Sequence, residues 1–386
     1  MRRGTFVRWG VPIAVAAVIG GAIGAGPVIA AVSGDPQLPE RSAQQLLADA
    51  VAASHKAGGP PPMSGTVQQT ASLGLPALPE SGGSSPLNLL SGSHEVKVWY
   101  GARNKLRVAF PTQMSESNLI VNGDQTWYWD SSTKTATKLK FDAGTQKPED
   151  LAPRPTDLTP QQAAERLLAN ADQHTAIRVI NNAEVAGRPA YQLVLAPKEE
   201  GSLVQEVRIA LDGETYVPLQ VQVYAKGSAE PAFQVGFTQV TFSAPAEENF
   251  RFTPPAGAKV EDKTISGKDL GKEHAEAEKA RGAVKSVGEG WTTVAVLPVS
   301  AAELAAKPQQ DQGGIDKGGE DKWDGKAPDF GSMADTVLKT ATPVSGSWGS
   351  GKLITTKLVT ALLTDDGRLL VGAVTPAEIE KAAGIK

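Results

Sequence analysis

The sequence predicts an α+β protein in which a large antiparallel sheet with one apolar face precedes a small C-terminal αβ domain. Residues 96–141 alternate between apolar and polar side chains, and Asn122-Gly123 separates two of these runs. A period of two with Asn-Gly turns is typical of an antiparallel meander that covers one face. Residues 291–374 instead contain short continuous apolar runs, which indicate strands covered on both faces. An apolar sheet face without groups for catalysis is better suited to holding an apolar ligand than to making or breaking bonds.

The first 33 residues predict a membrane anchor or a signal peptide. Arg2, Arg3 and Arg8 precede an uncharged stretch from Trp9 to Ser33. About 20 apolar residues suffice to cross a bilayer, and flanking positive residues stay on the cytoplasmic side. The stretch is long for the apolar core of a signal peptide, which favours a single-pass anchor, although the small residues at 28–31 would also suit cleavage. In both cases we expect the rest of the chain outside the cytoplasm, tethered to the extracytoplasmic face of the cell membrane or, after cleavage, secreted.

Residues 41–258 predict a single domain of helices and strands. An amphipathic helix runs from Ser42 to His55, and Thr159-Pro160 begins a second helix. The Gly-, Pro- and Leu-rich stretch 58–92 contains a short strand and is otherwise either a disordered insertion or an apolar flap. After the meander, alternating runs predict strands at 176–182, 189–196, 203–211, 217–223 and 233–237, with a hairpin at Asp212-Gly213 and a bulge before Val240.

The remainder of the chain predicts a linker and a second domain. Residues 259–290 are charge-rich and lack a strand pattern, so we expect a polar linker with a helix near 269–285. The C-terminal domain, 291–386, begins with an apolar run and is interrupted by the polar loop 308–329. Within it we expect strands at 352–363 and 368–374, covered by helices near 331–340 and 376–383.

Composition excludes several classes of function. Cysteine is absent, so neither disulfides nor thiolate metal sites can form. His55, His94, His174 and His274 are scattered without the spacing of a metal site. The formal net charge is −4, with no basic face interleaved with aromatics, so nucleic acid is not an expected partner. No nucleophile, base and acid can be assembled into a catalytic set, so we expect a non-enzymatic protein without a cofactor.

Two motifs can each be interpreted either as ordinary structural elements or as functional sites. Gly346 to Lys352 has the spacing of a phosphate-binding loop, but the next residue is Leu353 and lacks the hydroxyl that binds Mg²⁺, which favours a glycine-rich turn. Trp127 and Trp129 share one face of their predicted strand. They could stack on a sugar, although burial or contact with an apolar ligand is the commoner fate of such a pair.

Three stretches, taken in order, resemble a known family. The first contains Trp99-Tyr100-x-x-Arg103-Asn104, Glu116-Ser117-x-Leu119-Ile120-Val121-Asn122-Gly123-x-x-Thr126-Trp127-Tyr128-Trp129 and Lys134-Thr135-Ala136-Thr137. The second is Gly187-Arg188-Pro189-Ala190-Tyr191-Gln192-Leu193, and the third is Phe250-x-Phe252-Thr253-Pro254-Pro255-x-Gly257-Ala258. These stretches resemble the LolA superfamily of extracytoplasmic lipid and lipoprotein carriers, and the resemblance spans about residues 41–258. The succession of such a domain, a linker and a small αβ domain resembles the RseB/MucB type of envelope-stress regulator within that superfamily.

The resemblance implies a LolA-like incomplete antiparallel β-barrel whose apolar interior is covered by helices. It also implies that Arg103 locks a lid helix, because the family has an arginine at this turn that binds backbone carbonyls. The proline usually beside it is absent here, and a solvated turn arginine is the alternative. We expect the apolar wall of a lipid cavity to include Val98, Leu106, Val108, Leu119, Trp127, Leu193, Leu195, Val207, Ile209, Val221, Val223, Val235 and Phe237.

Two functions from different classes remain open. The first is a membrane-tethered protein that binds a lipid or a lipidated protein in the half-barrel. The second is a sensor whose barrel binds the ligand while the C-terminal domain engages a membrane protein such as an anti-sigma factor. A transporter is a further possible partner under the carrier hypothesis. Because carrier and sensor would share the same cavity, the cavity cannot separate them.

Overall fold

The computed structural model describes residues 38–54, 60–74, 91–141, 173–265, 282, 284–298 and 340–385. Several expected features lie outside these ranges: the N-terminal anchor or signal peptide, the flap at 75–90, and the helices near 159, 269–285 and 331–340. Within the described ranges, no helix has both the length and the apolar character that a membrane span requires.

The chain divides into two compact units, each with its own core. Unit 1 comprises residues 1–71, 92–198 and 205–279, and unit 2 comprises 72–91, 199–204 and 280–386. The short segment 199–204, which connects two strands of unit 1, belongs to unit 2 through backbone hydrogen bonds such as Leu203 N–H to Ala373 O at 2.8 Å.

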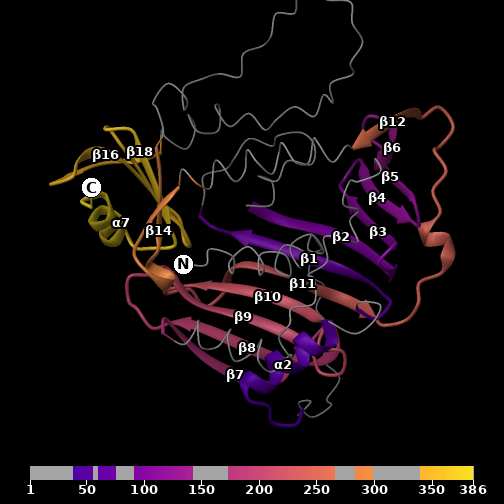
Figure 1. The fold of residues 1–386 in the computed structure, drawn as a ribbon, viewed down its shortest axis with the longest axis horizontal. Helices are drawn as coiled ribbons and strands as arrows, with labels where there is room; N and C mark the ends of the chain where they lie inside the picture. The colour runs from indigo at the N-terminus through magenta and orange to yellow at the C-terminus, as the bar shows by residue number, and fades with distance from the viewer. Residues whose placement is uncertain are drawn as a thin grey trace, which may run out of the picture. The chain divides into compact units, whose positions relative to one another are not determined.

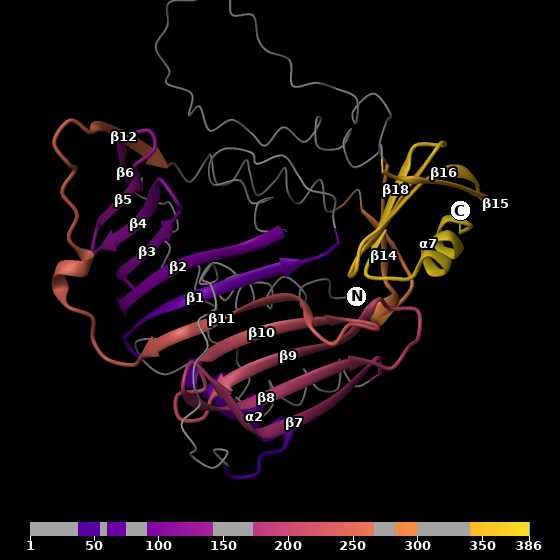
Figure 2. The same cartoon turned by 180° about the vertical axis from the view of Figure 1, so that it is seen from behind.

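Unit 1 is built on one twelve-stranded sheet that does not close into a barrel. Its order is β12-β6-β5-β4-β3-β2-β1-β11-β10-β9-β8-β7, so that β1 joins two meanders (Figures 1 and 2). The first contains β2 (Ser91–Ala102), β3 (Lys105–Pro111), β4 (Glu116–Asn122), β5 (Gln125–Asp130) and β6 (Thr135–Phe141). The second contains β7 (Thr175–Val185), β8 (Arg188–Pro197), β9 (Val204–Asp212), β10 (Pro218–Ala225) and β11 (Pro231–Thr241), and β1 spans Met63–Ser72. The predicted α+β class with an unclosed antiparallel sheet is thus confirmed.

One helix of unit 1, α2 (Ala43–Ser54), packs on the second meander. A capping box begins it: the Ser42 hydroxyl accepts from the Gln45 N–H at 3.2 Å, and the Gln45 side chain accepts from the Ser42 N–H at 3.0 Å. Leu46 is fully buried in a cluster with Tyr191, Leu193 and Leu211. The amphipathic helix expected from the sequence therefore forms and covers β8 and β9.

Strand β12 (Lys259–Ile265) corrects the expected linker at its start. It pairs in parallel with β6 along its whole length, from Lys259 opposite Thr135 to Ile265 opposite Phe141. Its charged side chains concealed it in the sequence. An edge strand is held by backbone hydrogen bonds and tolerates charge, here supplemented by the Lys140–Asp262 ion pair at 3.1 Å.

Unit 2 contains a six-stranded antiparallel sheet and helix α7 (Pro376–Ala383). The order is β13 (Lys285–Val287), β14 (Val294–Pro298), β18 (Arg368–Gly372), β17 (Thr360–Thr364), β16 (Gly349–Thr355) and β15 (Thr342–Gly346). Ile379 of α7 is fully buried against Leu362, Leu370 and Val374. The glycine-rich stretch 346–352 forms the turn between β15 and β16 and the start of β16. This agrees with its interpretation as a glycine-rich turn into a strand.

Candidate functional site

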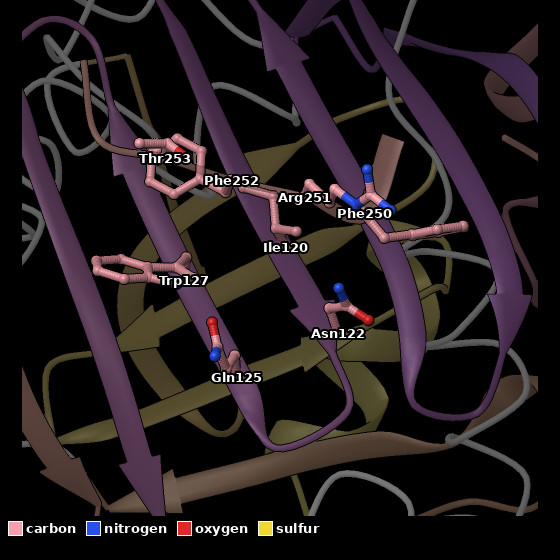
Figure 3. Close-up of a pocket in the computed structure, with 8 residues that line it drawn as sticks. All are labelled: Ile120, Asn122, Gln125, Trp127, Phe250, Arg251, Phe252 and Thr253. Atoms are coloured by element: carbon pink, nitrogen blue, oxygen red, sulfur yellow. The ribbon is translucent and has the colours of Figure 1, made fainter. Parts of the chain in front are cut away.

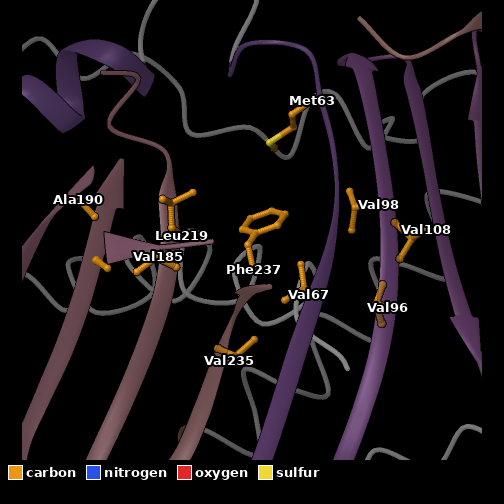
Figure 4. Close-up of a cluster of buried hydrophobic side chains, with 11 residues drawn as sticks. Met63, Val67, Val96, Val98, Val108, Val185, Ala190, Leu219, Val235 and Phe237 are labelled. Atoms are coloured by element: carbon orange, nitrogen blue, oxygen red, sulfur yellow. The ribbon is translucent and has the colours of Figure 1, made fainter. Parts of the chain in front are cut away.

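An apolar surface runs across one face of the unit 1 sheet. We call it the valine face, because Val67, Val98, Val108 and Val235 lie on it, all of them buried. Ala190 and Leu219 extend the same cluster across β8 and β10. In Figure 4, Phe237 lies between Leu219 on one side and Val67 and Val98 on the other. The face is therefore continuous from β8 to β3.

Eight of the thirteen predicted cavity residues lie on the valine face. Val98, Val108, Val235 and Phe237 are buried members of its core, and Leu106 and Val221 pack against that core. Leu119 is opposite Val108 in the β3–β4 register, so it lies on the same face as Val108. Val223 lies two residues after Val221 on β10 and therefore shares its face. Leu106, Leu119, Val221 and Val223 are only half-buried, so the apolar surface extends beyond its buried core on both sides.

The other five predicted residues lie on the opposite face, called here the helix face after α2. Leu193, Leu195 and Ile209 pack in the cluster around Leu46 of α2, and Val207 is opposite Leu195 in the register. Trp127 is opposite Ile120, whereas Leu119 is opposite Tyr128, so Trp127 and Leu119 point to different sides of the sheet. Side chains alternate strictly between faces along a strand. The register therefore does not bring these five residues to the same wall as Val98.

Arg103 lies in the turn between β2 and β3, and its side chain is exposed. Burial raises the pKa of the nearby Tyr100, and the positive charge of Arg103 partly opposes that shift. The structure thus places Arg103 beside a side chain that packs against the valine-face core. Its expected role in locking a lid stays a prediction.

Two charged groups on the valine face were not expected from the sequence. Asp212 is fully buried, and it accepts hydrogen bonds from the Arg188 guanidinium and from the N–H and hydroxyl of Thr215, both at 2.8 Å. Burial alone would raise the pKa of Asp212, but these donors outweigh it and hold that pKa below its usual value. Asp212 is opposite Ala190, so the ion pair lies at the margin of the apolar surface.

The second charged group contains one carboxylate and two guanidinium groups. Arg178 Nη2 lies 2.6 Å from Glu206 Oε2, and Arg208 Nε lies 2.6 Å from Glu206 Oε1. Burial raises the pKa of Glu206, but the hydrogen bonds from Arg208 and Arg178 outweigh it and leave that pKa below its usual value. Arg178 and Arg208 are both opposite Val194 in the register. Their charges therefore share the valine face. The alternation in β9 places Glu206 and Arg208 on one side of that strand, but the sequence does not say which face of the sheet that side belongs to.

A pocket of about 250 Å³ lies on the helix face of the first meander. Ile120 and Asn122 from β4 and Gln125 and Trp127 from β5 line one side, and the segment 250–253 crosses over them (Figure 3). The sequence indicated Trp127 but gave no sign that residues 250–253 would cover it. Across the described ranges, no three His, Asp or Glu side chains lie close enough together to hold a metal ion.

Comparisons with known proteins extend the two resemblances noted in the sequence. No family model matches the chain, and a search of curated proteins gives no significant match. Among solved structures it is similar to Pseudomonas aeruginosa MucB in its complex with MucA, at 14% identity over 88% of this chain and 96% of that one, with a TM-score of 0.40. It is also similar to a LolA superfamily protein from Nitrosomonas europaea, at 11% identity over 55% of this chain and 99% of that one, with a TM-score of 0.21.

Proposed function

We propose that the chain is a non-enzymatic extracytoplasmic protein that holds the acyl chain of a lipid or lipidated protein against the valine face. The observation that carries the proposal is the half-buried apolar margin, Leu106 and Leu119 on one side and Val221 and Val223 on the other, continuous with a buried core. Small closed barrels fill their interior with their own side chains, whereas this sheet stays open. Partly exposed apolar residues that border a buried apolar core are typical of a ligand or partner site.

The charged groups at the margin are consistent with an amphiphilic ligand. Asp212 with Arg188 and Glu206 with its two arginines lie on the same face as the apolar residues. Each is internally paired, and both lie on the β7–β9 side of the apolar residues of β10, where the polar part of an amphiphile would lie. In this proposal, residues 1–33 tether the protein to the membrane.

A pair of matched variants tests the proposal. Val221→Asp places a charge on the valine face, and Val207→Asp places the same charge on a neighbouring strand but on the helix face. Lipids extracted from each purified variant would be identified and quantified by mass spectrometry, with folding checked by circular dichroism. We expect Val221→Asp to lose co-purifying lipid and Val207→Asp to retain it. Equal lipid content in two folded variants, or no lipid in the unmodified protein, would contradict the proposal.

A second candidate function is a sensor that regulates an anti-sigma factor through unit 2. The observation that favours it is the sheet face away from α7. Ala361, Leu363, Leu369 and Val371 lie on that face by register and are only half-buried. Such an apolar surface suits a protein partner. Leu363→Asp should abolish capture of a membrane partner and leave co-purifying lipid unchanged. If the protein is a carrier without this regulatory role, the unmodified protein and Leu363→Asp should capture the same partners.

A further inference from the structure

The charged group around Glu206 carries more positive than negative charge. Its carboxylate is paired with two guanidinium groups, because Arg178 Nη2 lies 2.6 Å from Oε2 and Arg208 Nη2 lies 2.5 Å from Oε1. Glu206 is ionised near neutral pH, since its pKa lies below the usual value. Two positive charges and one negative charge leave this group with a net charge of +1.

The excess positive charge is accessible at the surface of the valine face. The side chain of Glu206 is 9% exposed, whereas those of Arg178 and Arg208 are 55% and 32% exposed. An arginine has five N–H donors, and in the described part of the chain Arg178 donates to Glu206 from Nη2 alone. The carboxylate is thus enclosed, and further donors of Arg178 remain for an anion that approaches from solvent.

Arg208 brings this positive charge beside the apolar residues of β10. Its guanidinium lies over the ring of Tyr224, 4.5 Å from the ring centroid. Tyr224 follows Val223 on β10, which is the neighbour of β9 in the sheet (Figure 2). Val221 and Val223 are half-buried residues of the proposed acyl site. A molecule whose apolar part lies on β10 therefore has its polar end next to the two arginines.

The other charged group of the valine face has the opposite sign and lies at the far end of β9. Arg188 is paired with both Asp212 and Glu214, so two negative charges and one positive charge leave a net charge of −1. Asp212 and Glu206 lie six residues apart on β9, which corresponds to about 20 Å along an extended strand. An anionic headgroup is attracted to the Glu206 end of the face and repelled by the Asp212 end.

We propose that the ligand of the valine face is a lipid with a monoanionic phosphodiester headgroup, and that Arg178 and Arg208 bind this headgroup. The inference rests on the proposed function, since it assigns the polar part of the lipid whose acyl chain the valine face holds. A guanidinium donates two parallel hydrogen bonds to two oxygens of a phosphate. One negative charge balances the net charge of the group around Glu206. A zwitterionic headgroup adds a cation that the two arginines repel.

The test offers the full chain two lipids that differ only in their headgroups, one anionic and one zwitterionic. Vesicles with equal amounts of phosphatidylglycerol and phosphatidylcholine, both with the same acyl chains, would be incubated with the protein. The lipids on the separated protein would be quantified by mass spectrometry. We expect the unmodified protein to hold about tenfold more phosphatidylglycerol than phosphatidylcholine. Arg178→Gln should lower this ratio to about two, because the exposed donors and the net positive charge are both lost.

Two further variants separate the headgroup site from general effects of charge. Arg251→Gln removes an arginine that is also paired with a carboxylate, that of Glu248, but lies on the segment across the helix face, so it should leave the ratio unchanged. Glu206→Gln raises the net charge of its group to +2 and should increase the ratio, which a purely structural role of Glu206 would not do. Excess inorganic phosphate, at constant ionic strength, should leave the bound lipid in place because it lacks an acyl chain.

The outcomes distinguish this inference from the proposed function. Equal amounts of both lipids on the unmodified protein would leave acyl binding in place and overturn the headgroup assignment. A ratio that Arg178→Gln and Arg251→Gln lower alike would place the anion elsewhere on the chain. Displacement of the bound lipid by inorganic phosphate would show an anion site that does not depend on the acyl chain. Binding of neither lipid would overturn the proposed function and this inference with it.

Discussion

Arg188 on β8 holds the buried carboxylate of Asp212 at the end of β9, with its Nη2 donating to Asp212 Oδ1 at 3.1 Å. The same carboxylate accepts from the Glu214 N–H and from Thr215 and so organises the turn into β10. The guanidinium also lies over the Phe242 ring, 4.8 Å from its centroid. One ion pair therefore fixes the hairpin between the strands that carry Ala210 and Leu219 of the valine face.

Asp212→Asn should lower the free energy of unfolding by about 3 kcal/mol near neutral pH, because it leaves a partly buried guanidinium without its counter-charge. The pKa of Asp212 is lower in the folded than in the unfolded chain. Its stabilising effect is thus complete above the unfolded-state value of about 3.9 and is lost as pH falls through the folded-state value. Denaturant unfolding across the acid range should show a smaller loss of stability in Asp212→Asn than in the unmodified protein. Parallel pH profiles would contradict this role.

Leu46→Ala should cost about 2–5 kcal/mol, because the side chain is fully buried between α2 and the sheet and its removal leaves a cavity. Gln44→Ala, on the exposed side of the same helix, serves as the control and should change stability by less than about 0.5 kcal/mol. Chemical denaturation followed by circular dichroism measures both variants. Similar midpoints for the two would mean that α2 does not depend on this contact.

Arg103→Ala should raise the pKa of Tyr100 further, because the positive charge that favours the phenolate is removed while the burial that raises the pKa stays. An absorbance titration of tyrosine ionisation, compared with Tyr100→Phe to isolate the signal, measures the shift. Stability should change by less than about 0.5 kcal/mol, as for other exposed turn residues. An unchanged titration curve would show that Arg103 lies too far from Tyr100 to act on it.

Ile379→Ala should destabilise unit 2 by about 2–5 kcal/mol, since Ile379 of α7 is fully buried against Leu362 and Leu370 of the sheet. Because the two units have separate cores, lipid co-purifying with the chain should be unaffected. Hydrogen exchange followed by mass spectrometry would locate the loss of protection. A loss that extends to β10 and β11 would mean that the units unfold together.

The sequence predicted most strands because alternation and turn residues act locally. The bulge before Val240 was predicted correctly and appears where β1 and β11 shift register, between Thr66 and Val67. Alternation within a strand does not show which of its two sides lies on the same face of the sheet as a given side of the next strand. Leu211 packs beneath α2, whereas Leu219 across the hairpin lies on the valine face. The turn between them decides this, and its geometry depends on the buried contacts of Asp212.

Because the sequence does not show which strand sides share a face, the list of predicted cavity residues contains residues from both faces of the sheet. Each of these apolar runs was identified correctly as a strand. Five of the listed residues nevertheless belong to the helix face, because that face is apolar as well, beneath α2 and beneath the segment 250–253. Apolar residues on both sides of a sheet look alike in a single sequence. The cross-strand charges at Glu206 were missed for a related reason, since Arg178 and Arg208 are distant in sequence and only the register brings them together.

The location of a bound acyl chain is the most direct test of the account. A fatty acid with a photoreactive diazirine at its methyl end would be bound to the full chain and irradiated, and the labelled peptides would be mapped by mass spectrometry. Labels are predicted in β3, β10 and β11, which carry Leu106, Val221 and Val235 of the valine face, and an unlabelled fatty acid should compete them away. Labels confined to α2 and the helix face, or labelling that the competitor does not reduce, would contradict the proposal that the valine face holds the lipid.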